Sequence, residues 1–328
     1  MDYNISASAE KTAKIDLTEK RLKSSLKKKS LLRDLARDYQ LYIMLIPTIA
    51  FFLIFVYLPF YGVQIAFKDY NLFLGIGKSN WTGLTHFINF FTGPYFWQNL
   101  RNTFLISFYG LLFGFPACII FALSVNELQN KHYKAFVQTA SYLPYFVSSV
   151  VVASLVINFL SPSYGIVNRI LNLFGAESKY FMILPEYFRT IYTVMGIWHS
   201  MGFNSIIFLA ALSSIDVQLY EAATLDGANK LKQIIHVTLP GIMPTIVVML
   251  ILRIGQMLNV GYETIILLYQ PATYETADVI STYVYRLGIV GADYGYATAV
   301  DLFNSVVTCA LVIGANKISN KVSDMGIW

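Results

Sequence analysis

Two ionisable and two amide side chains interrupt the apolar runs of the C-terminal third of the chain: Arg253, Gln256, Asn259 and Asp301. An ionisable side chain in lipid is costly, so it points to a cavity, an ion pair or a bound ligand. Arg253, Gln256 and Asn259 recur every three residues, which places them near one face of a helix. Two interpretations stay open: Asp301 pairs with Arg253, or Arg253 faces a pore and binds a substrate carboxylate, such as that of a uronic acid.

A second group of side chains has the chemistry of a sugar pathway. A sugar ring offers C–H patches to flat apolar faces and hydroxyl groups to hydrogen-bonding side chains. Trp198, His199 and Asn204 lie in one apolar run, and Tyr262 follows the run that contains Arg253. Aromatic residues make up 16% of the chain, so most rings must pack against lipid or other helices. Each of these residues is therefore a candidate both for the pathway and for packing.

The amino-acid composition indicates that most of the chain lies in a membrane rather than in water. Of 328 residues, 56% are apolar and 13% are charged, about half the roughly 25% of charged residues in a soluble domain. This balance excludes a soluble enzyme and a disordered chain. Cys118 and Cys309 are too few for a disulfide framework or a zinc site, and the four histidines are scattered, so no metal site is expected.

The charges are separated by six long apolar runs, of which only the last two contain a charged residue, Arg253 and Asp301 respectively. A segment that crosses lipid must satisfy its backbone hydrogen bonds internally, which requires a helix. The sequence therefore predicts an all-α integral membrane protein with six transmembrane helices. Their expected ranges are 42–66, 104–125, 145–160, 191–212, 242–258 and 296–315.

The distribution of lysine and arginine predicts the orientation. Residues 1–40 form a tail with ten basic and six acidic residues, and basic flanks stay in the cytoplasm. Six spans then return the C-terminus to the same side, where Lys317 and Lys321 follow the last run. We expect a cytoplasmic tail over 1–40, a six-helix domain over 41–316 and a short cytoplasmic tail over 317–328.

The predicted cytoplasmic segment 216–241 is too patterned for a simple connector. Glu221–Ala223 favours a helix, and Gly227 is placed to end it. An apolar stripe follows at helical spacing, formed by Leu231, Ile234 and Ile235. Leu239–Pro240 is expected to stop the segment. An amphipathic helix between a glycine and a proline suits docking in the groove of another protein.

This segment resembles the EAA loop of bacterial ABC importer permeases. The matching positions are Glu221, Ala222, Ala223, Asp226, Gly227, Ala228, Leu239, Pro240 and Pro244. The resemblance extends from about Arg33 to Trp328 and includes NELQNKHYKAFVQTASYLPYF and ADVISTYVYRLGI, which are similar to the polysaccharide and oligosaccharide branch of the maltose-type permeases.

The resemblance implies a type I importer permease fold and a half-transporter in a bacterial cell membrane. The implied partners are a second homologous permease, a dimer of ATPase subunits that bind ATP and Mg, an extracytoplasmic sugar-binding protein, an oligosaccharide and membrane lipid. Glu221 is expected to face basic residues of the ATPase, and Gly227 to let the coupling helix sit in the ATPase cleft. No cofactor on this chain, no enzymatic activity and no nucleic-acid partner are expected.

Two other classes of protein were weighed against this one. An ion-coupled carrier or channel working alone would use Arg253 and Asp301 as coupling charges, and a membrane enzyme, such as a glycosyl transferase, would need clustered catalytic groups. The segment 216–241 favours the importer permease over a lone carrier, because a lone carrier needs no glycine-hinged loop for an ATPase.

Overall fold

The computed structural model describes residues 37–323. The chain divides into two compact units, Met1–Val63 and Gln64–Trp328. Nearly all of the predicted basic tail and the last five residues of the predicted C-terminal tail therefore lie outside the described residues.

The first unit contains most of a continuous apolar helix, Tyr39–Phe67, long enough to cross a membrane. Its successive parts are α2 (Tyr39–Phe51), the π-helical η1 (Phe52–Tyr57) and the 3-10 helix η2 (Leu58–Phe67), which continues into the second unit. The large apolar side chains of α2 and η1 are exposed, as expected for a helix surrounded by lipid. The predicted span 42–66 is confirmed.

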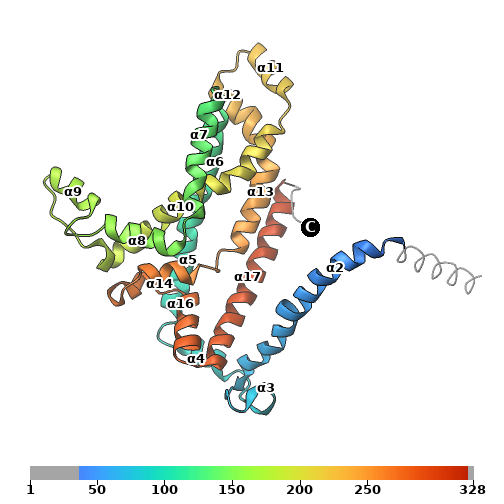
Figure 1. Cartoon of the computed structure of the whole chain (residues 1–328), viewed down its shortest axis with the longest axis vertical. Helices are drawn as coiled ribbons and strands as arrows, with labels where there is room; N and C mark the ends of the chain where they lie inside the picture. The colour runs from blue at the N-terminus through green and yellow to red at the C-terminus, as the bar shows by residue number, and fades with distance from the viewer. Residues whose placement is uncertain (1–36, 324–328) are drawn as a thin grey trace, which may run out of the picture. The chain divides into compact units, whose positions relative to one another are not determined.

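The second unit is almost entirely helical (Figure 1). Its elements are β1 (Lys68–Asp69), α3 (Gly75–Lys78), β2 (Asn80–Trp81), α4 (Thr85–Thr92), α5 (Phe96–Tyr109), η3 (Gly110–Gly114), α6 (Phe115–Asn126), α7 (Lys131–Tyr142), η4 (Leu143–Phe146), α8 (Ser149–Phe159), α9 (Ile166–Leu173), η5 (Phe181–Ile183), α10 (Pro185–Ser213), α11 (Val217–Leu225), α12 (Lys230–Gln233), η6 (Ile234–Thr238), α13 (Leu239–Gly255), α14 (Tyr262–Leu268), η7 (Pro271–Thr273), α15 (Tyr274–Ala277), α16 (Ile280–Tyr285), η8 (Arg286–Val290) and α17 (Tyr294–Ser323). The strands β1 and β2 form a short antiparallel pair.

Four long helical segments of this unit are apolar enough to span a membrane. They are Phe96–Asn126, Pro185–Ser213, Lys230–Gly255 and Tyr294–Lys321. The helices α6, α10 and α13 share one apolar core, and α13 packs beside α17 (Figure 1). Three of these segments cover the predicted runs 104–125, 191–212 and 296–315, and Lys230–Gly255 covers the run 242–258 up to residue 255. The helix α17 continues through residues 317–323 of the predicted C-terminal tail.

The third predicted span is not a single helix. Lys131–Phe146 and Ser149–Phe159 meet at a bend of 100°. Pro144 lies in η4 just before the bend, and Val147 and Ser148 are extended. An α-helix over 145–160 was therefore a wrong prediction, because an apolar run fixes membrane character but not the continuity of the helix. Including this bent pair, the described residues hold up to six candidate spans.

The boundaries of the fifth span also differ from the prediction. Leu239 and Pro240 do not stop the preceding segment, because the helix runs from Lys230 to Gly255. The π-helical turn η6 directly precedes α13, where Pro240 occupies the first turn. A proline there interrupts the regular backbone ladder, and the wider π-turn accommodates the interruption. At the other end, α13 stops at Gly255, so the predicted helix to residue 258 is too long.

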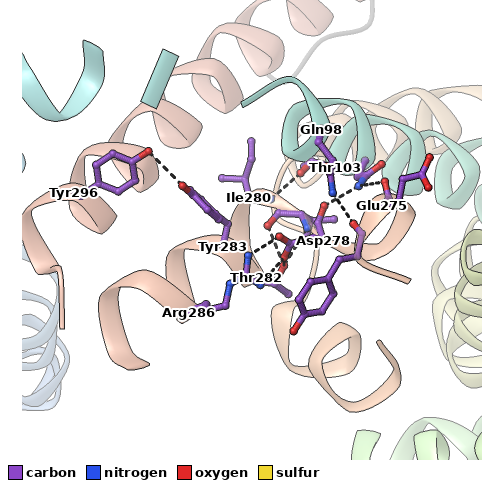
Figure 2. A network of polar contacts seen from close by, with 12 residues as sticks. Gln98, Thr103, Glu275, Asp278, Ile280, Thr282, Tyr283, Arg286 and Tyr296 are labelled. Carbon is purple, nitrogen blue, oxygen red and sulfur yellow. Dashed lines mark hydrogen bonds and ion pairs between the residues drawn. The ribbon is translucent and has the colours of Figure 1, made fainter. Parts of the chain in front are cut away.

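A polar network fastens the segment before α17 to the spans (Figure 2). The carboxylate of Asp278 accepts hydrogen bonds from Nη1 and Nη2 of Arg286 at 3.1 and 2.6 Å, and from Oγ1 of Thr282 at 2.8 Å. The hydrogen bonds and charge of Asp278 raise the pKa of Arg286 above its ordinary value. This pair stabilises the turn between α15 and α16.

Asn102 of α5 connects this turn to two spans. Its Nδ2 donates to the carbonyl oxygens of Glu275 and Asp278, each at 2.9 Å, and its Oδ1 accepts from Nη2 of Arg189 on α10 at 2.9 Å. Thr103 Oγ1 accepts from the backbone N–H of Ile280 at 3.0 Å. These bonds fix the segment between α15 and α16 to the spans that contain α5 and α10.

Candidate functional site

A cavity of about 410 Å³ lies among the membrane spans of the second unit. Residues from α5, η3, α6, α8, α10, α13 and α14 line it. Its volume is in the range of small-molecule sites, which is about 300–1,000 Å³. Aromatic and apolar side chains alternate there with hydrogen-bonding groups, among them Phe115, Tyr192 and Phe208 beside Ser149, Ser200 and Thr264. This mixture suits a ligand with both C–H faces and hydroxyl groups.

The structure brings three of the predicted pathway residues together in this cavity: Asn204, Arg253 and Gln256. His199 also lines it, and its Nε2 donates to the carbonyl oxygen of Val147 at 3.0 Å. Val147 lies at the bend between η4 and α8, where the helix leaves a backbone carbonyl without its regular partner. The role of His199 in this structure is therefore to satisfy the broken span.

Several polar side chains of the cavity have no hydrogen-bond or ion-pair partner among the described residues. Within the described part of the chain, no hydrogen bond or ion pair engages the side chains of Thr193, Asn204, Arg253 or Gln256. Thr193 is 9% exposed, and its Oγ1 is fully buried. Buried polar groups are normally hydrogen-bonded, so the unpaired hydroxyl of Thr193 favours a partner from outside the chain. Asn204 is half-buried, and Arg253 and Gln256 are exposed, so their polar atoms are open to the same partner.

The possible pair between Arg253 and Asp301 is not formed. Among the described residues, no ion pair joins them, and Asp301 is exposed on α17 and does not line the cavity. A Cβ on Gly255 would lie 2.9 Å from Cγ2 of Val312, so α13 approaches α17 there. Asp301 precedes Val312 by eleven residues, which at 1.5 Å per residue is about 16 Å along the helix.

The other predicted pathway residues lie elsewhere. Trp198 is 51% exposed and does not line the cavity. Tyr262 stacks on Tyr285, with ring centroids 5.3 Å apart. Asn259 lies beyond the end of α13, in a turn where its N–H donates to the carbonyl of Gln256. The predicted common face of Arg253, Gln256 and Asn259 is therefore wrong for Asn259, because the helix has already ended.

Sequence reasoning missed a stripe of small and polar residues on α10. Thr193, Gly196, Ser200 and Asn204 follow one another at intervals of three, four and four residues, and all line the cavity. This spacing is that of one helical face. The stripe is therefore a signal that could have located the cavity, although only Asn204 was predicted from it.

At one end of the second unit, α11 presents the segment that matches the EAA loop (Figure 1). Asp216 begins the helix, since its Oδ1 accepts from the N–H of Gln218 at 2.9 Å. The helix ends at Gly227, whose φ is +76°. The N–H groups of Gly227 and Ala228 donate to the carbonyls of Thr224 and Ala223 at 3.0 and 2.9 Å, the pattern of a Schellman cap. The expectation that Gly227 ends this helix is confirmed.

The surface of α11 is open. A shallow groove runs along it, lined by Tyr220, Glu221, Thr224, Leu225, Ala228, Asn229, Lys230 and Gln233. Leu225 is 90% exposed, and Glu221 is exposed with no ion pair among the described residues. Asp226 and Gly227 form the turn at the tip. The side chains of Leu225 and Glu221 are therefore accessible to another protein.

The fold and the cavity define a multi-pass membrane permease. The family described as "Binding-protein-dependent transport system inner membrane component" matches residues 110–320. "Protein LplB" of Bacillus subtilis (strain 168) is 44% identical over 294 residues, covering 90% of this chain and 92% of that protein. "Polygalacturonan/rhamnogalacturonan transport system permease protein YteP" of the same organism is 42% identical over 302 residues, covering 92% and 94%.

Solved structures agree with this match. One is described as a bacterial ABC transporter involved in the import of the acidic polysaccharide alginate. It superimposes with a TM-score of 0.83 at 49% identity, covering 89% of this chain and 99% of that chain. A second contains the alginate transporter with a periplasmic protein bound to alginate pentasaccharide, also with a TM-score of 0.83 at 49% identity. The chain belongs to the family of binding-protein-dependent transport system inner membrane components. It is thus a membrane transport subunit of the importer class, as the sequence predicted.

Proposed function

We propose that this chain is one of two membrane-spanning subunits of an ATP-driven importer for oligosaccharides that contain uronic acids. The observation that carries the proposal is the cavity among the spans, in which hydrogen-bonding groups alternate with aromatic and apolar faces. The uronic-acid class is supported by the relatives, which are named for polygalacturonan and rhamnogalacturonan transport and for alginate import.

The surface of α11 is the proposed docking site for an ATPase subunit. Glu221 would face basic residues of the ATPase, and Leu225 would enter an apolar part of its cleft. Ala222 and Ala223 belong to the helix, while Asp226, Gly227 and Ala228 form its rigid cap. Leu239 and Pro240 begin α13 without a break after η6, so a push on this end would be transmitted to the span.

The proposed complex contains a second homologous permease, two ATPase subunits with ATP and Mg, and an extracytoplasmic sugar-binding protein. The solved alginate transporter with its periplasmic protein supports the binding protein in this complex. The proposed location is a bacterial cell membrane with both chain termini in the cytoplasm, which the basic residues before the first span favour. ATP-driven closure of the ATPases would then shift the spans between inward-open and outward-open states.

The test begins with purification of the tagged chain from its native host in mild detergent. The complex is then reconstituted into vesicles with ATP inside and the binding protein outside. We expect a second permease and an ATPase to be retained, and uptake of tri-galacturonate to require ATP. Recovery of the chain alone, moving solute without ATP, would refute the proposal in favour of a lone carrier.

A further inference from the structure

We infer that Arg253 determines the substrate specificity of the cavity by binding a carboxylate of the transported oligosaccharide. The inference rests on the proposed function, because it names the substrate group that the pathway recognises. The predicted alternative, an internal pair with Asp301, is absent from the described structure. The guanidinium of Arg253 is thus available to a ligand.

The position of Arg253 favours this role. A Cβ on Gly110 would lie 3.6 Å from Nη2 of Arg253, so the guanidinium lies beside a residue with no side chain. Gly110 begins the π-helical turn η3 and is close to the midpoint of the span Phe96–Asn126. π-turns within helices are frequent at functional sites. Arg253 itself lies in the last turn of α13 and its side chain is exposed, so the guanidinium reaches open space beside the middle of the span Phe96–Asn126.

The cavity supplies no anion of its own. Its lining residues include no aspartate or glutamate. A guanidinium presents a planar fork that matches a carboxylate, so the missing partner is best supplied by a carboxylate from outside the chain.

The polar side chains around Arg253 favour a uronic acid as its partner over a carboxylate of the second permease. Thr193, Asn204 and Gln256 line the same cavity, and their side chains have no hydrogen-bond partner within the described residues. A carboxylate from the second permease would satisfy Arg253 but leave these three groups unused. A uronic-acid unit carries one carboxylate and several hydroxyl groups, which matches one cation surrounded by neutral donors and acceptors.

The first experiment compares two probes that differ in charge. The intact complex is reconstituted with its binding protein, and ATP-dependent uptake of tri-galacturonate is measured beside that of its methyl ester. We expect Arg253→Gln to lower uptake of the acid by about 10- to 100-fold, the range of one charge-assisted hydrogen bond, with much less effect on the ester. Arg253→Lys should retain part of the preference. Arg169→Gln, at an exposed arginine outside the cavity, is the matched control and should leave the ratio of the two uptakes unchanged.

A second experiment separates charge from structure. Arg253→Cys is made with Cys118→Ser and Cys309→Ser, so that position 253 carries the only thiol of the chain. Methanethiosulfonate reagents then attach an ammonium, a sulfonate or a methyl group through a disulfide, with methanesulfinate as the leaving group. We expect the ammonium adduct alone to restore uptake of the acid.

The outcomes distinguish this inference from the proposed function. Equal loss of both probes in Arg253→Gln, or equal restoration by the ammonium and methyl adducts, would overturn the role of Arg253. Failure of every adduct to restore uptake of the acid would also overturn it. Import of the ester but not the acid by the wild-type complex would also overturn the role of Arg253, while the proposal of an oligosaccharide importer would stand. Absence of any ATP-dependent uptake by the wild type would instead refute the proposed function.

Discussion

Replacement of Asp278 by alanine is expected to lower the free energy of unfolding by about 3 kcal/mol. Its carboxylate is 3% exposed and accepts hydrogen bonds from Arg286 and Thr282. Removing one partner of a buried ion pair costs about 3–5 kcal/mol, because the other charge loses its compensation. The side chain of Arg286 is 32% exposed, so water hydrates part of the guanidinium and the lower end of the range applies.

A double-mutant cycle isolates the pair itself. Asp278→Ala combined with Arg286→Met should cost less than the sum of the two single substitutions by about 2 kcal/mol, because no unpaired charge remains. The raised pKa of Arg286 adds an expectation about pH. A group whose pKa is raised on folding contributes stability that is fully present below its unfolded pKa and is lost as the pH rises through the folded pKa. The contribution of Arg286 should therefore be constant through the neutral and alkaline range.

The assay is thermal unfolding of the purified protein in detergent, followed by tryptophan fluorescence. A loss of 3 kcal/mol corresponds to a fall of about 4 °C for a chain of this size. Glu127→Ala is the control, because the pair between Lys230 and Glu127 is exposed, at 3.4 Å, and should contribute at most about 1 kcal/mol. If Asp278→Ala lowers the transition temperature no more than Glu127→Ala, the network does not stabilise the fold as argued.

Three further predictions concern the ends and contacts of helices. Glu221→Lys should preserve folding but release the ATPase during co-purification, and full retention would contradict docking through Glu221. Gly227→Val should reduce ATP-coupled uptake at least about tenfold, because valine is strained at the positive φ of this position, while a Cβ there meets no atom within 4 Å. Gly227→Asn should have a much milder effect, because asparagine tolerates a positive φ. Equal effects of the two substitutions would exclude backbone strain as the cause. Gly202→Ala should lower the unfolding temperature, because its Cβ would lie 2.1 Å from the carbonyl oxygen of Ser141, whereas Gly314→Ala has free space and should not.

Much of the fold could be predicted because lipid allows few backbone solutions. Every uncharged run of sufficient length became helical, and the prediction of membrane spans needed no knowledge of packing. The bend at Val147 and Ser148 could not be found in this way, since both arms belong to one uncharged run. The end of α13 at Gly255 was missed for the same reason. Continuity of a helix depends on tertiary partners that replace the missing backbone bonds.

The site was predicted in part. Asn204, Arg253 and Gln256 line the cavity because a polar side chain in a span must find a polar environment. Trp198 and Tyr262 do not, because an aromatic ring is equally stable against lipid, another ring or a ligand. The end of α11 could be predicted from sequence because a helix cap depends on local residue types. At the end of α11, for example, Gly227 adopts the positive φ that the cap requires.

Helix interruptions near the cavity leave backbone carbonyls without their regular partners. Some polar side chains satisfy these carbonyls and therefore have a structural role, whereas others have no such role and are available to a ligand. The carbonyl of Val147 is satisfied by His199, that of Met257 by the Ser107 hydroxyl, and that of Val260 by the Ser281 hydroxyl at 2.7 Å. Irregular backbone at membrane depth is tolerated where it is buried in protein or lines a cavity, and these side chains meet that requirement. Arg253 serves no such backbone group among the described residues, so its guanidinium is available to a ligand in the cavity.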